Sequence, residues 1–312
     1  MKTKALAYDN VLLIPDYSDL SSRSLADTSV DFLGRKFKLP IIPANMKDVI
    51  NPTLAKWFSE NDLFYIMHRF DVDNHEFVKR ANEENWKLAS ISTGVNDVSK
   101  QSLEKISIDG YNIDVITIDV AHGFHLKVWK QIEWIKNKFP NTKIIAGNVA
   151  TAEAAKSLEI WGASCVKAGI GGGKICSTRY QTGFHVPMYT CIKDICDSDI
   201  QIPVIADGGV KYMGDIAKAI NAGATMIMAG GLFAECINSP AEIVNGKKQY
   251  NGSTSFAVKK ENRHIEGISL VMDSGVTVEE RIDEITMALQ SSISYSGGKE
   301  LKSLLKCDYN II

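Results

Sequence analysis

The residues best suited to chemistry lie in residues 168–184, A-G-I-G-G-G-K-I-C-S-T-R-Y-Q-T-G-F. Three consecutive glycines, Gly171 to Gly173, permit backbone conformations that other residues avoid and let a ligand approach closely. Cys176 follows them, and the S-T-R after it adds two hydroxyls and the guanidinium of Arg179. A thiol on a glycine loop is placed to act as a nucleophile, and a nearby cation would favour its thiolate. The alternative is a structural cysteine beside a flexible turn.

The composition excludes several classes of protein. The chain has 312 residues, 45% hydrophobic and 23% charged, with a net charge of -2. This balance is typical of a globular protein, and the charge gives no field directed at nucleic acid or an acidic membrane. No apolar run approaches the ~20 residues of a membrane span, and Asp9 interrupts any secretory signal. We therefore expect a cytoplasmic protein.

The cysteines show no metal-binding pattern. They are Cys165, Cys176, Cys191, Cys196, Cys236 and Cys307. None forms a C-x-x-C pair, and no Cys/His set has zinc spacing. In a reducing compartment all are free thiols, and we expect every one except Cys176 to serve packing.

Apolar runs of strand length alternate with stretches of helical spacing along most of the chain. The expected strands are residues 39–44, 63–68, 88–93, 115–119, 143–147, 164–169, 203–206 and 225–229. The expected helices are residues 52–61, 74–85, 98–108, 124–139, 152–161, 188–196, 213–222 and 278–291. This alternation predicts an α/β fold, a (β/α)8 TIM barrel, with a doubly wound open sheet as the alternative.

The remaining segments complete the expected organisation. Residues 1–35 indicate an irregular N-terminal arm, and we expect the whole chain, 1–312, to form a single TIM-barrel domain. The polar stretch 238–275 follows the eighth strand and is too long for a simple connection. We expect it to be an active-site flap.

Glycines and polar residues collect at the carboxyl ends of the expected strands. Gly208 and Gly209 follow the seventh strand, and Gly230 and Gly231 follow the eighth. Barrels commonly bind phosphate there, through bare backbone N–H groups. Asp207 precedes the first pair and is placed to accept hydrogen bonds from sugar hydroxyls. Together they predict a ribose-phosphate ligand, although a single glycine pair is more often an ordinary turn.

Other polar residues support two interpretations each. Asp119 either orients a ligand or caps the next helix, and Arg69 either binds a phosphate or is a solvated charge. His122 and His125 have helical spacing but no carboxylate or cysteine set beside them, so a metal site is the minority interpretation. Glu266 is by default an exposed loop residue, and becomes a general acid or base only if the flap lies over the cysteine.

Several motifs together resemble the IMP dehydrogenase/GMP reductase family. They are G-I-G-G-G-K-I-C-S-T-R, A-D-G-G, M-A-G-G, P-A-N-M, and Y-D-N-V-L-L-I-P with S-S-R-S, in the family's order from about residue 6 to about residue 298. The chain is more similar to the short reductases, which it also resembles in F-Y-I-M-H-R-F, I-E-G and Q-S-S-I-S-Y-S-G-G. It lacks the regulatory insertion usual in the dehydrogenases and their Arg-Tyr flap pair, since Arg263 precedes His264.

The resemblance implies NADPH-dependent reductive deamination of GMP to IMP and ammonia, a step of purine nucleotide interconversion and salvage. Cys176 would attack purine C2 and release ammonia, and the resulting thioimidate would accept a hydride. Thr178 and Glu266 would transfer the proton to the leaving amine. A flap that excludes water would protect the intermediate from hydrolysis.

The resemblance also implies binding residues. Substrate contacts would be Asp207, Gly208, Gly209, Gly230, Gly231, Gly252, Ser253, Thr254, Arg263, His264, Ile265 and Gly267. Cofactor contacts would be Ser22, Arg23, Arg69, Asp119, Val120, Ala121, Ile170, Gly171, Ser292, Ser294 and Tyr295, the last three reaching a neighbouring subunit's cofactor. Carbonyls of Gly171, Gly173, Cys176 and Arg179 would hold a monovalent cation such as K+. The family also implies a homotetramer.

Three departures from the family pattern affect these implications. Gly172 replaces a proline, which adds backbone entropy to the loop. The first strand is followed by M-K-D rather than M-D-T, and the flap turn reads G-S-T-S rather than G-M-S-S. The alternative functions are an IMP dehydrogenase, which would reduce NAD with IMP, and a non-catalytic purine nucleotide-binding barrel in which Cys176 only packs.

Overall fold

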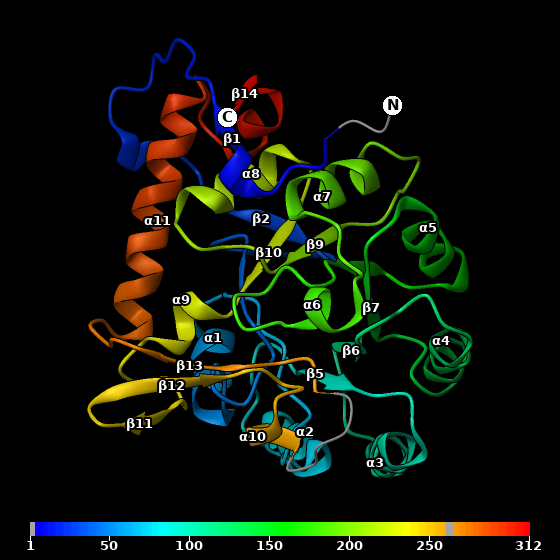
Figure 1. Ribbon diagram of the computed structural model, residues 1–312. Coiled ribbons are helices and arrows are strands. Elements are labelled where there is room, and N and C mark those ends of the chain that lie inside the picture. Colours follow the sequence, from blue (N-terminus) through cyan, green and yellow to red (C-terminus); the bar gives the residue numbers. More distant parts are fainter. Residues whose placement is uncertain (1–3, 260–264) are drawn as a thin grey trace.

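The computed structural model describes residues 4–259 and 265–312 (Figure 1). Its largest sheet is parallel and comprises β4 (Ile41–Pro43), β5 (Ser90–Thr93), β6 (Val115–Asp119), β7 (Lys143–Val149), β8 (Cys165–Ala168), β9 (Val204–Asp207) and β10 (Met226–Ala229). The order is β4-β10-β9-β8-β7-β6-β5, so the last strand pairs with the first. A doubly wound sheet would reverse its order at a switch point. The fold is the predicted (β/α)8 barrel.

The second expected strand, residues 63–68, is the one that the structure does not assign as a strand. Met67 alone pairs there with Ile91, its N–H donating to the Ser90 carbonyl at 3.0 Å. One ladder step earlier, the Leu88 carbonyl accepts a hydrogen bond from the Tyr65 hydroxyl at 2.7 Å. A side chain thus occupies the acceptor that a regular ladder would use. The segment still fills the second position of the barrel.

Helices cover the outside of the barrel (Figure 1). The longer ones are α1 (Pro52–Glu60), α2 (Asn74–Glu83), α3 (Asp97–Ile108), α4 (Leu126–Lys138), α5 (Ala152–Trp161), α7 (Met188–Cys196), α8 (Gly214–Asn221) and α11 (Val278–Tyr295). Side chains cap several N-termini, such as Asn51 of α1 and Thr151 of α5. α4 begins later than expected because His125 is its cap, accepting from the Lys127 N–H.

Short helices complete the chain. They are α6 (Thr178–Thr182), α9 (Gly231–Ala234), α10 (Phe256–Lys259) and the 3-10 turns η1 (Tyr8–Asn10), η2 (Arg23–Leu25) and η3 (Leu301–Lys306). The expected 278–291 helix continues to Tyr295, with Ser296 as its C-cap, and Gly297 follows with a positive φ of 76°.

The N-terminal arm is more regular than expected. β1 (Val11–Leu13) pairs antiparallel with β14 (Tyr309–Ile311), so β1 lies beside the C-terminal strand at the top of Figure 1. β2 (Val30–Phe32) and β3 (Arg35–Phe37) form a hairpin. The Phe32 ring packs 5.0 Å from that of Phe64, which closes the end of the barrel where the strands begin.

Residues 238–275, expected as a flap, contain an antiparallel sheet of their own. Its strands are β11 (Glu242–Val244), β12 (Lys247–Asn251) and β13 (Ser269–Met272). α10 lies between β12 and β13 in the sequence. The sheet gives this segment an internal framework that polarity alone did not predict.

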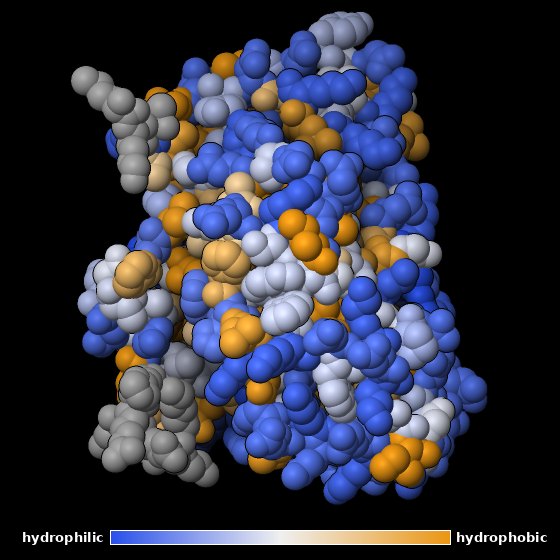
Figure 2. All heavy atoms as spheres, turned by 90° about the vertical axis from the view of Figure 1, so that its right-hand side faces the viewer, coloured by the Kyte–Doolittle hydropathy of each residue, from blue (hydrophilic) through white to orange (hydrophobic). Residues whose placement is uncertain are grey.

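The outer surface is polar where the helices face solvent. Figure 2 shows the side on which α4 and α5 lie, with hydrophobic residues scattered among hydrophilic ones. Over the residues that the structure describes, no helix is long and apolar enough to cross a bilayer.

Candidate active site

A cavity of about 240 Å³ opens at the carboxyl ends of the barrel strands, the usual place for a barrel active site. Its walls come from the loops that follow the strands and from the flap. Of the residues singled out in the sequence, those lining it are Arg69, Asp119, Val120, Ala121, Ile170, Gly171, Gly173, Cys176, Thr178, Asp207, Gly208, Gly209, Gly230, Gly231, Gly252, Ser253, Thr254, Glu266 and Gly267. The fold therefore gathers most of the expected site residues into one space.

The three expected catalytic residues form one chain of hydrogen bonds. The Cys176 thiol donates to the Thr178 hydroxyl, with 3.1 Å between Sγ and Oγ1. The Thr178 hydroxyl donates to the Glu266 carboxylate at 2.7 Å. All three side chains are half-buried. This arrangement can pass a proton from the thiol to the carboxylate through one hydroxyl, which is how a base activates a nucleophile.

Backbone contacts between the flap and the cysteine loop position Glu266. The Ser177 N–H donates to the Glu266 carbonyl at 2.7 Å, and the Ile268 N–H donates to the Ile175 carbonyl at 2.9 Å. Gly267 pairs with Cys176 as an isolated antiparallel bridge. A Cβ on Gly252 would lie 2.8 Å from the Gly267 Cα, so the chains meet closely at two glycines.

Arg179 does not supply a cation to Cys176. Its guanidinium donates to the Tyr180 hydroxyl at 2.7 Å and lies 4.6 Å from the centre of that ring. The residue is exposed and is absent from the cavity wall. Neighbouring residues on a helix point in different directions, so α6 turns Thr178 towards the thiol and Arg179 away from it. The expectation of a neighbouring guanidinium is therefore wrong.

A buried lysine connects two of the expected binding residues. The Lys167 ammonium lies 2.9 Å from the Asp119 carboxylate and 2.6 Å from that of Asp207, with its side chain 3% exposed. Asn148 donates to the same Asp207 oxygen at 2.8 Å. Burial alone would lower the pKa of Lys167, but the two carboxylates raise it above its ordinary value. The charged lysine therefore fixes both carboxylates in the cavity wall.

Lys167 was missed in the sequence analysis, and Asn148, at the end of the fifth expected strand, was given no role. Lys167 stands within C-V-K-A, the β8 strand, whose four residues are all buried. Parallel strands buried on both faces are near-continuously hydrophobic, so a lysine inside one is itself a signal of a buried charge partner. Tyr250, Asn45 and Lys174 also line the cavity without having been singled out.

The glycine that replaces the family's proline has a packing partner. A Cβ on Gly172 would lie 2.7 Å from the Met188 sulfur. The same side chain would meet a Cβ on Gly169 at 3.0 Å and one on Gly209 at 2.8 Å. Met188 is 2% exposed and fills the space behind the loop. The missing proline ring is thus replaced by a packed side chain rather than by empty space.

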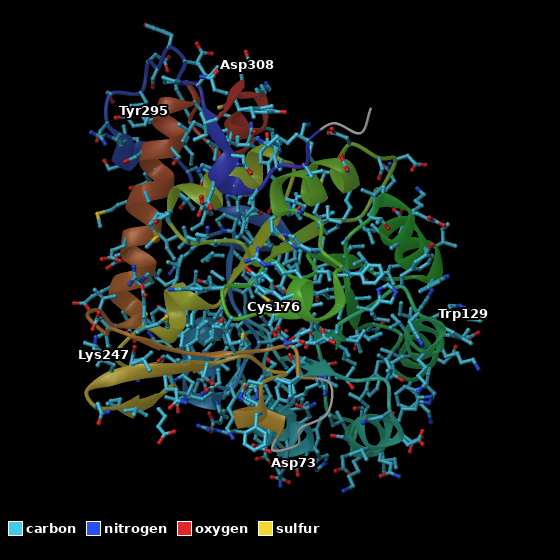
Figure 3. The ribbon with its side chains drawn as sticks, in the orientation of Figure 1. Asp73, Trp129, Cys176, Lys247, Tyr295 and Asp308 are labelled. Carbon is cyan, nitrogen blue, oxygen red and sulfur yellow. The ribbon has the colours of Figure 1, made fainter. Side chains whose placement is uncertain are left out.

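Some expected site residues lie elsewhere. Arg23 donates to Ser291 at 3.3 Å, and the Tyr295 carbonyl accepts from the Asp16 N–H at 2.9 Å. Figure 3 shows Tyr295 towards the upper end of α11 and Cys176 near the centre of the molecule. The residues absent from the cavity wall are Ser22, Arg23, Ser292, Ser294, Tyr295, Arg179 and Ile265. Arg263 and His264 lie outside the described residues. The contact of Ser292, Ser294 and Tyr295 with a neighbouring subunit stays a prediction.

Metal-binding side chains do not cluster in the part of the chain that the structure describes. No group of three or more His, Cys, Asp or Glu residues there could hold a metal ion. His125 uses its Nδ1 to cap α4. All six cysteines are free thiols.

The fold and the site define a (β/α)8 barrel protein whose cysteine, hydroxyl and carboxylate are hydrogen-bonded to one another in a cavity at the carboxyl ends of the strands. A family model described as the IMP dehydrogenase / GMP reductase domain matches residues 5–311, and the chain belongs to this family. Similar curated proteins include GMP reductases of Staphylococcus carnosus (strain TM300), Staphylococcus epidermidis (strain RP62A) and Staphylococcus aureus (strain JH9). Each is 44% identical over 315 residues, covering 99% of this chain and 97% of the relative.

Proposed function

We propose that this protein is a GMP reductase, converting GMP to IMP and ammonia with NADPH in purine nucleotide salvage. The observation that carries the proposal is the hydrogen-bond chain from Cys176 through Thr178 to Glu266. The name shared by the 44% identical relatives supports the same substrate. The missing Arg-Tyr flap pair argues against the dehydrogenase direction.

The residues support a reaction in two stages. Glu266 takes the thiol proton through Thr178, and the Cys176 thiolate adds to purine C2. The 2-amino group takes a proton from Glu266 and leaves as ammonia, which gives a thioimidate. C2 then accepts a hydride, and the bond between carbon and sulfur breaks to release IMP and the thiolate. The flap excludes water that would otherwise hydrolyse the thioimidate.

The cavity suits a nicotinamide cofactor next to the cysteine. When bound, NADPH supplies the hydride. Arg69 lines the cavity, and its buried Nε has no hydrogen-bond partner among the described residues. An unpartnered guanidinium nitrogen is a ready donor to an anionic group. We assign the cofactor to Arg69, Asp119, Val120, Ala121, Ile170 and Gly171, with Ser22, Arg23, Ser292, Ser294 and Tyr295 contributing across a homotetramer interface.

The substrate and the cation occupy the loops around the thiol. We assign the nucleotide to Asp207, the glycine pairs after β9 and β10, the turn 252–254 and residues 263–267, within a single barrel domain. The cation would be held by carbonyls of Gly171, Gly173, Cys176 and Arg179. The carbonyls of Gly173 and Arg179 each accept one N–H, from Cys176 at 3.1 Å and from Gly183 at 3.2 Å. A carbonyl oxygen has two lone pairs, so both keep one for K+.

One assay tests the proposed function. We expect NADPH oxidation that depends on GMP, with IMP and ammonia formed in equal amounts. Cys176→Ala should lower kcat by roughly 10³-fold or more, as the loss of a covalent nucleophile does. Cys307→Ala, in which the lost thiol lies outside the cavity, should retain activity.

Three results would contradict the proposal. NAD reduction with IMP in place of GMP reduction would make the protein an IMP dehydrogenase. GMP binding without turnover would leave a nucleotide-binding barrel, and unchanged turnover in Cys176→Ala would make the thiol structural.

A further inference from the structure

A buried carboxylate connects the flap to the loop after the first barrel strand. Asp48 lies in the M-K-D segment after β4 and is 7% exposed. One of its oxygens, Oδ2, accepts two hydrogen bonds from Asn251, from the backbone N–H at 2.6 Å and from Nδ2 at 2.8 Å. Asn251 is the last residue of β12, immediately before the turn 252–254. The contact therefore joins the barrel to the flap at the point where the flap enters the cavity wall.

The same contact extends into the next flap strand. The Ser269 hydroxyl donates to Asn251 Oδ1 at 2.6 Å, and these residues face each other in the β12–β13 ladder. β13 continues the segment that carries Glu266 and Gly267. A neighbouring contact reinforces the attachment, because the Tyr250 hydroxyl donates to the Met46 sulfur at 3.3 Å. Asp48 thus holds both flap strands that border the active site.

The charges around Asp48 leave Asn251 as its main polar partner. Lys47 pairs its ammonium with Asp71 at 2.7 Å and acts on Asp48 only from beyond ion-pair distance. Glu242 on the flap is a second negative charge that acts on Asp48. Among the described residues, no cation lies within ion-pair distance of the Asp48 carboxylate. A buried carboxylate is costly unless it is hydrogen-bonded, and charge-assisted hydrogen bonds are stronger than neutral ones. Separating Asn251 from Asp48 is therefore unfavourable.

We propose that Asp48 is a positioning residue that anchors the flap over the active site. The flap is attached at two places: at Cys176 through Gly267 and Glu266, and at the opposite wall through Asp48 and Asn251. With both attachments made, the turn 252–254 and Glu266 keep one position relative to the thiol. The kinetic consequence rests on the proposed function, whereas the attachment itself does not.

Hydrogen–deuterium exchange of the ligand-free protein tests the attachment directly. In Asp48→Ala, amides of β12 and β13 should exchange about tenfold faster, while those of β6 to β8 should not change. Asp48→Asn keeps an acceptor oxygen and should largely restore protection. Asp273→Ala is the matched control, because it removes an 88% exposed carboxylate that pairs with Lys247 on the same flap. Unchanged exchange in Asp48→Ala, or faster exchange throughout the barrel, would overturn the proposal.

A double-mutant cycle with Asn251→Ala shows whether the two residues act as a pair. Asn251→Ala removes the Nδ2 bond but keeps the backbone N–H bond to Asp48, so it should loosen the flap less than Asp48→Ala. The double variant should exchange no faster than Asp48→Ala, which already lacks both bonds. If Asp48→Ala does not fold, Asn251→Ala carries the test, because it removes the Nδ2 bond to Asp48 and the acceptor of the Ser269 hydroxyl. Amides of β12 and β13 should then exchange faster than in the parent, and equal protection would refute the anchor.

Kinetics separate this proposal from the proposed function. The KM for GMP should rise about tenfold in Asp48→Ala and remain near the parent value in Asp273→Ala. If the flap amides exchange faster in Asp48→Ala than in the parent, but the parent does not turn over GMP, the anchor is supported and the proposed function is contradicted. If the parent turns over GMP, but Asp48→Ala matches it in both exchange and KM, the proposed function is supported and the anchor is contradicted.

Discussion

At the scale of single residues, Lys167 is the cation that pairs with two acidic residues of the cavity wall. It lies on β8 with Asp119 at the end of β6 and Asp207 at the end of β9. Burial alone would raise the pKa of Asp119, but the ammonium of Lys167 lowers it below its ordinary value. Asp119 therefore stays ionised in the cavity wall. One cation links the proposed cofactor side of the cavity to the proposed ribose side.

Replacing Lys167 by methionine should damage both stability and activity. The substitution keeps the volume but leaves two half-buried carboxylates without their cation, which we expect to cost about 3 kcal/mol of unfolding free energy. Lys167→Arg keeps the charge and should recover much of the stability. Denaturant unfolding and kcat/KM for GMP measure the two effects.

A surface lysine provides the control. Lys156→Met breaks solvent-screened ion pairs with Glu159 and Asp199 on the outside of the barrel and should change stability little. If Lys167→Met lost no more stability than Lys156→Met, the charge network would not be what holds the two acids.

At the scale of elements, the flap fits the barrel through close contacts at glycines. A Cβ on Gly230, in the loop after β10, would lie 1.9 Å from the Tyr250 hydroxyl on β12. Tyr250 is buried, and burial raises the pKa of its hydroxyl well above the ordinary value, so the group remains neutral. The side chain therefore occupies a fixed slot between two strand-end loops. Any side chain at position 230 has to displace the flap strand.

Gly230→Ala should raise the KM for GMP by about tenfold or more, because the new methyl group pushes Tyr250 and β12 out of the cavity wall. Adding Tyr250→Phe removes the clashing oxygen and should restore part of the flap's position, seen as renewed exchange protection of β12. Gly214→Ala, where a Cβ meets nothing within 4 Å, should behave as the parent. Equal KM values in Gly230→Ala and the parent would contradict this assignment.

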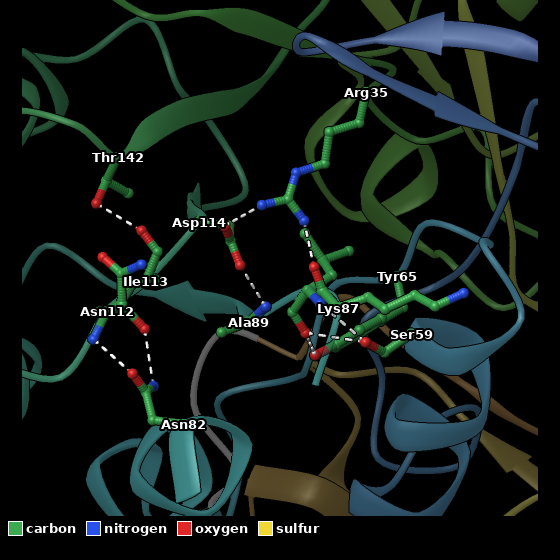
Figure 4. A network of polar contacts seen from close by, with 11 residues as sticks. Arg35, Ser59, Tyr65, Asn82, Lys87, Ala89, Asn112, Ile113, Asp114 and Thr142 are labelled. Atoms are coloured by element: carbon green, nitrogen blue, oxygen red, sulfur yellow. Dashed lines mark hydrogen bonds and ion pairs between the residues drawn. The ribbon is translucent and has the colours of Figure 1, made fainter. Parts of the chain in front are cut away.

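At the scale of the whole molecule, the end of the barrel where the strands begin contributes stability and the end where they finish holds the active-site cavity, as in other barrels. Figure 4 shows the polar network at the end where the strands begin. Arg35 from the β2–β3 hairpin contacts the Asp114 carboxylate and the Lys87 carbonyl, and Asp114 accepts from the Ala89 N–H at 2.7 Å. These contacts connect the hairpin to the starts of β5 and β6. The cavity lies at the other end of the same strands.

Asp114→Ala should therefore lower stability without changing substrate affinity. It leaves the Ala89 N–H without its acceptor and Arg35 with only the Lys87 carbonyl, which we expect to cost about 2 kcal/mol of unfolding free energy. The KM for GMP should stay within about twofold of the parent, since no cavity residue contacts Asp114. Asp62→Ala, which breaks an exposed pair with Lys87, is the control for charge removal at this end. A change in KM as large as the one in Gly230→Ala would show that the ends are coupled.

Much of the barrel could be predicted because each helix or strand is specified by a short run of consecutive residues. The expected strand 115–119 and the helices 152–161 and 188–196 match β6, α5 and α7 residue for residue. Period and apolar content along a short stretch are sufficient for such elements. The 63–68 segment was misjudged because its pairing depends on the Tyr65 side chain, which reaches across to another strand.

The sequence alone determined the barrel, the cysteine loop and the glycine pairs, because each is written in consecutive residues. Only the tertiary structure brought Glu266 within 2.7 Å of Thr178, directed Arg179 away, and paired Lys167 with two acids and Asp48 with Asn251. These partners lie far apart along the chain. Contacts of that kind depend on which strand ends meet at one rim of the barrel and on which way each side chain points, and neither can be read from composition or spacing.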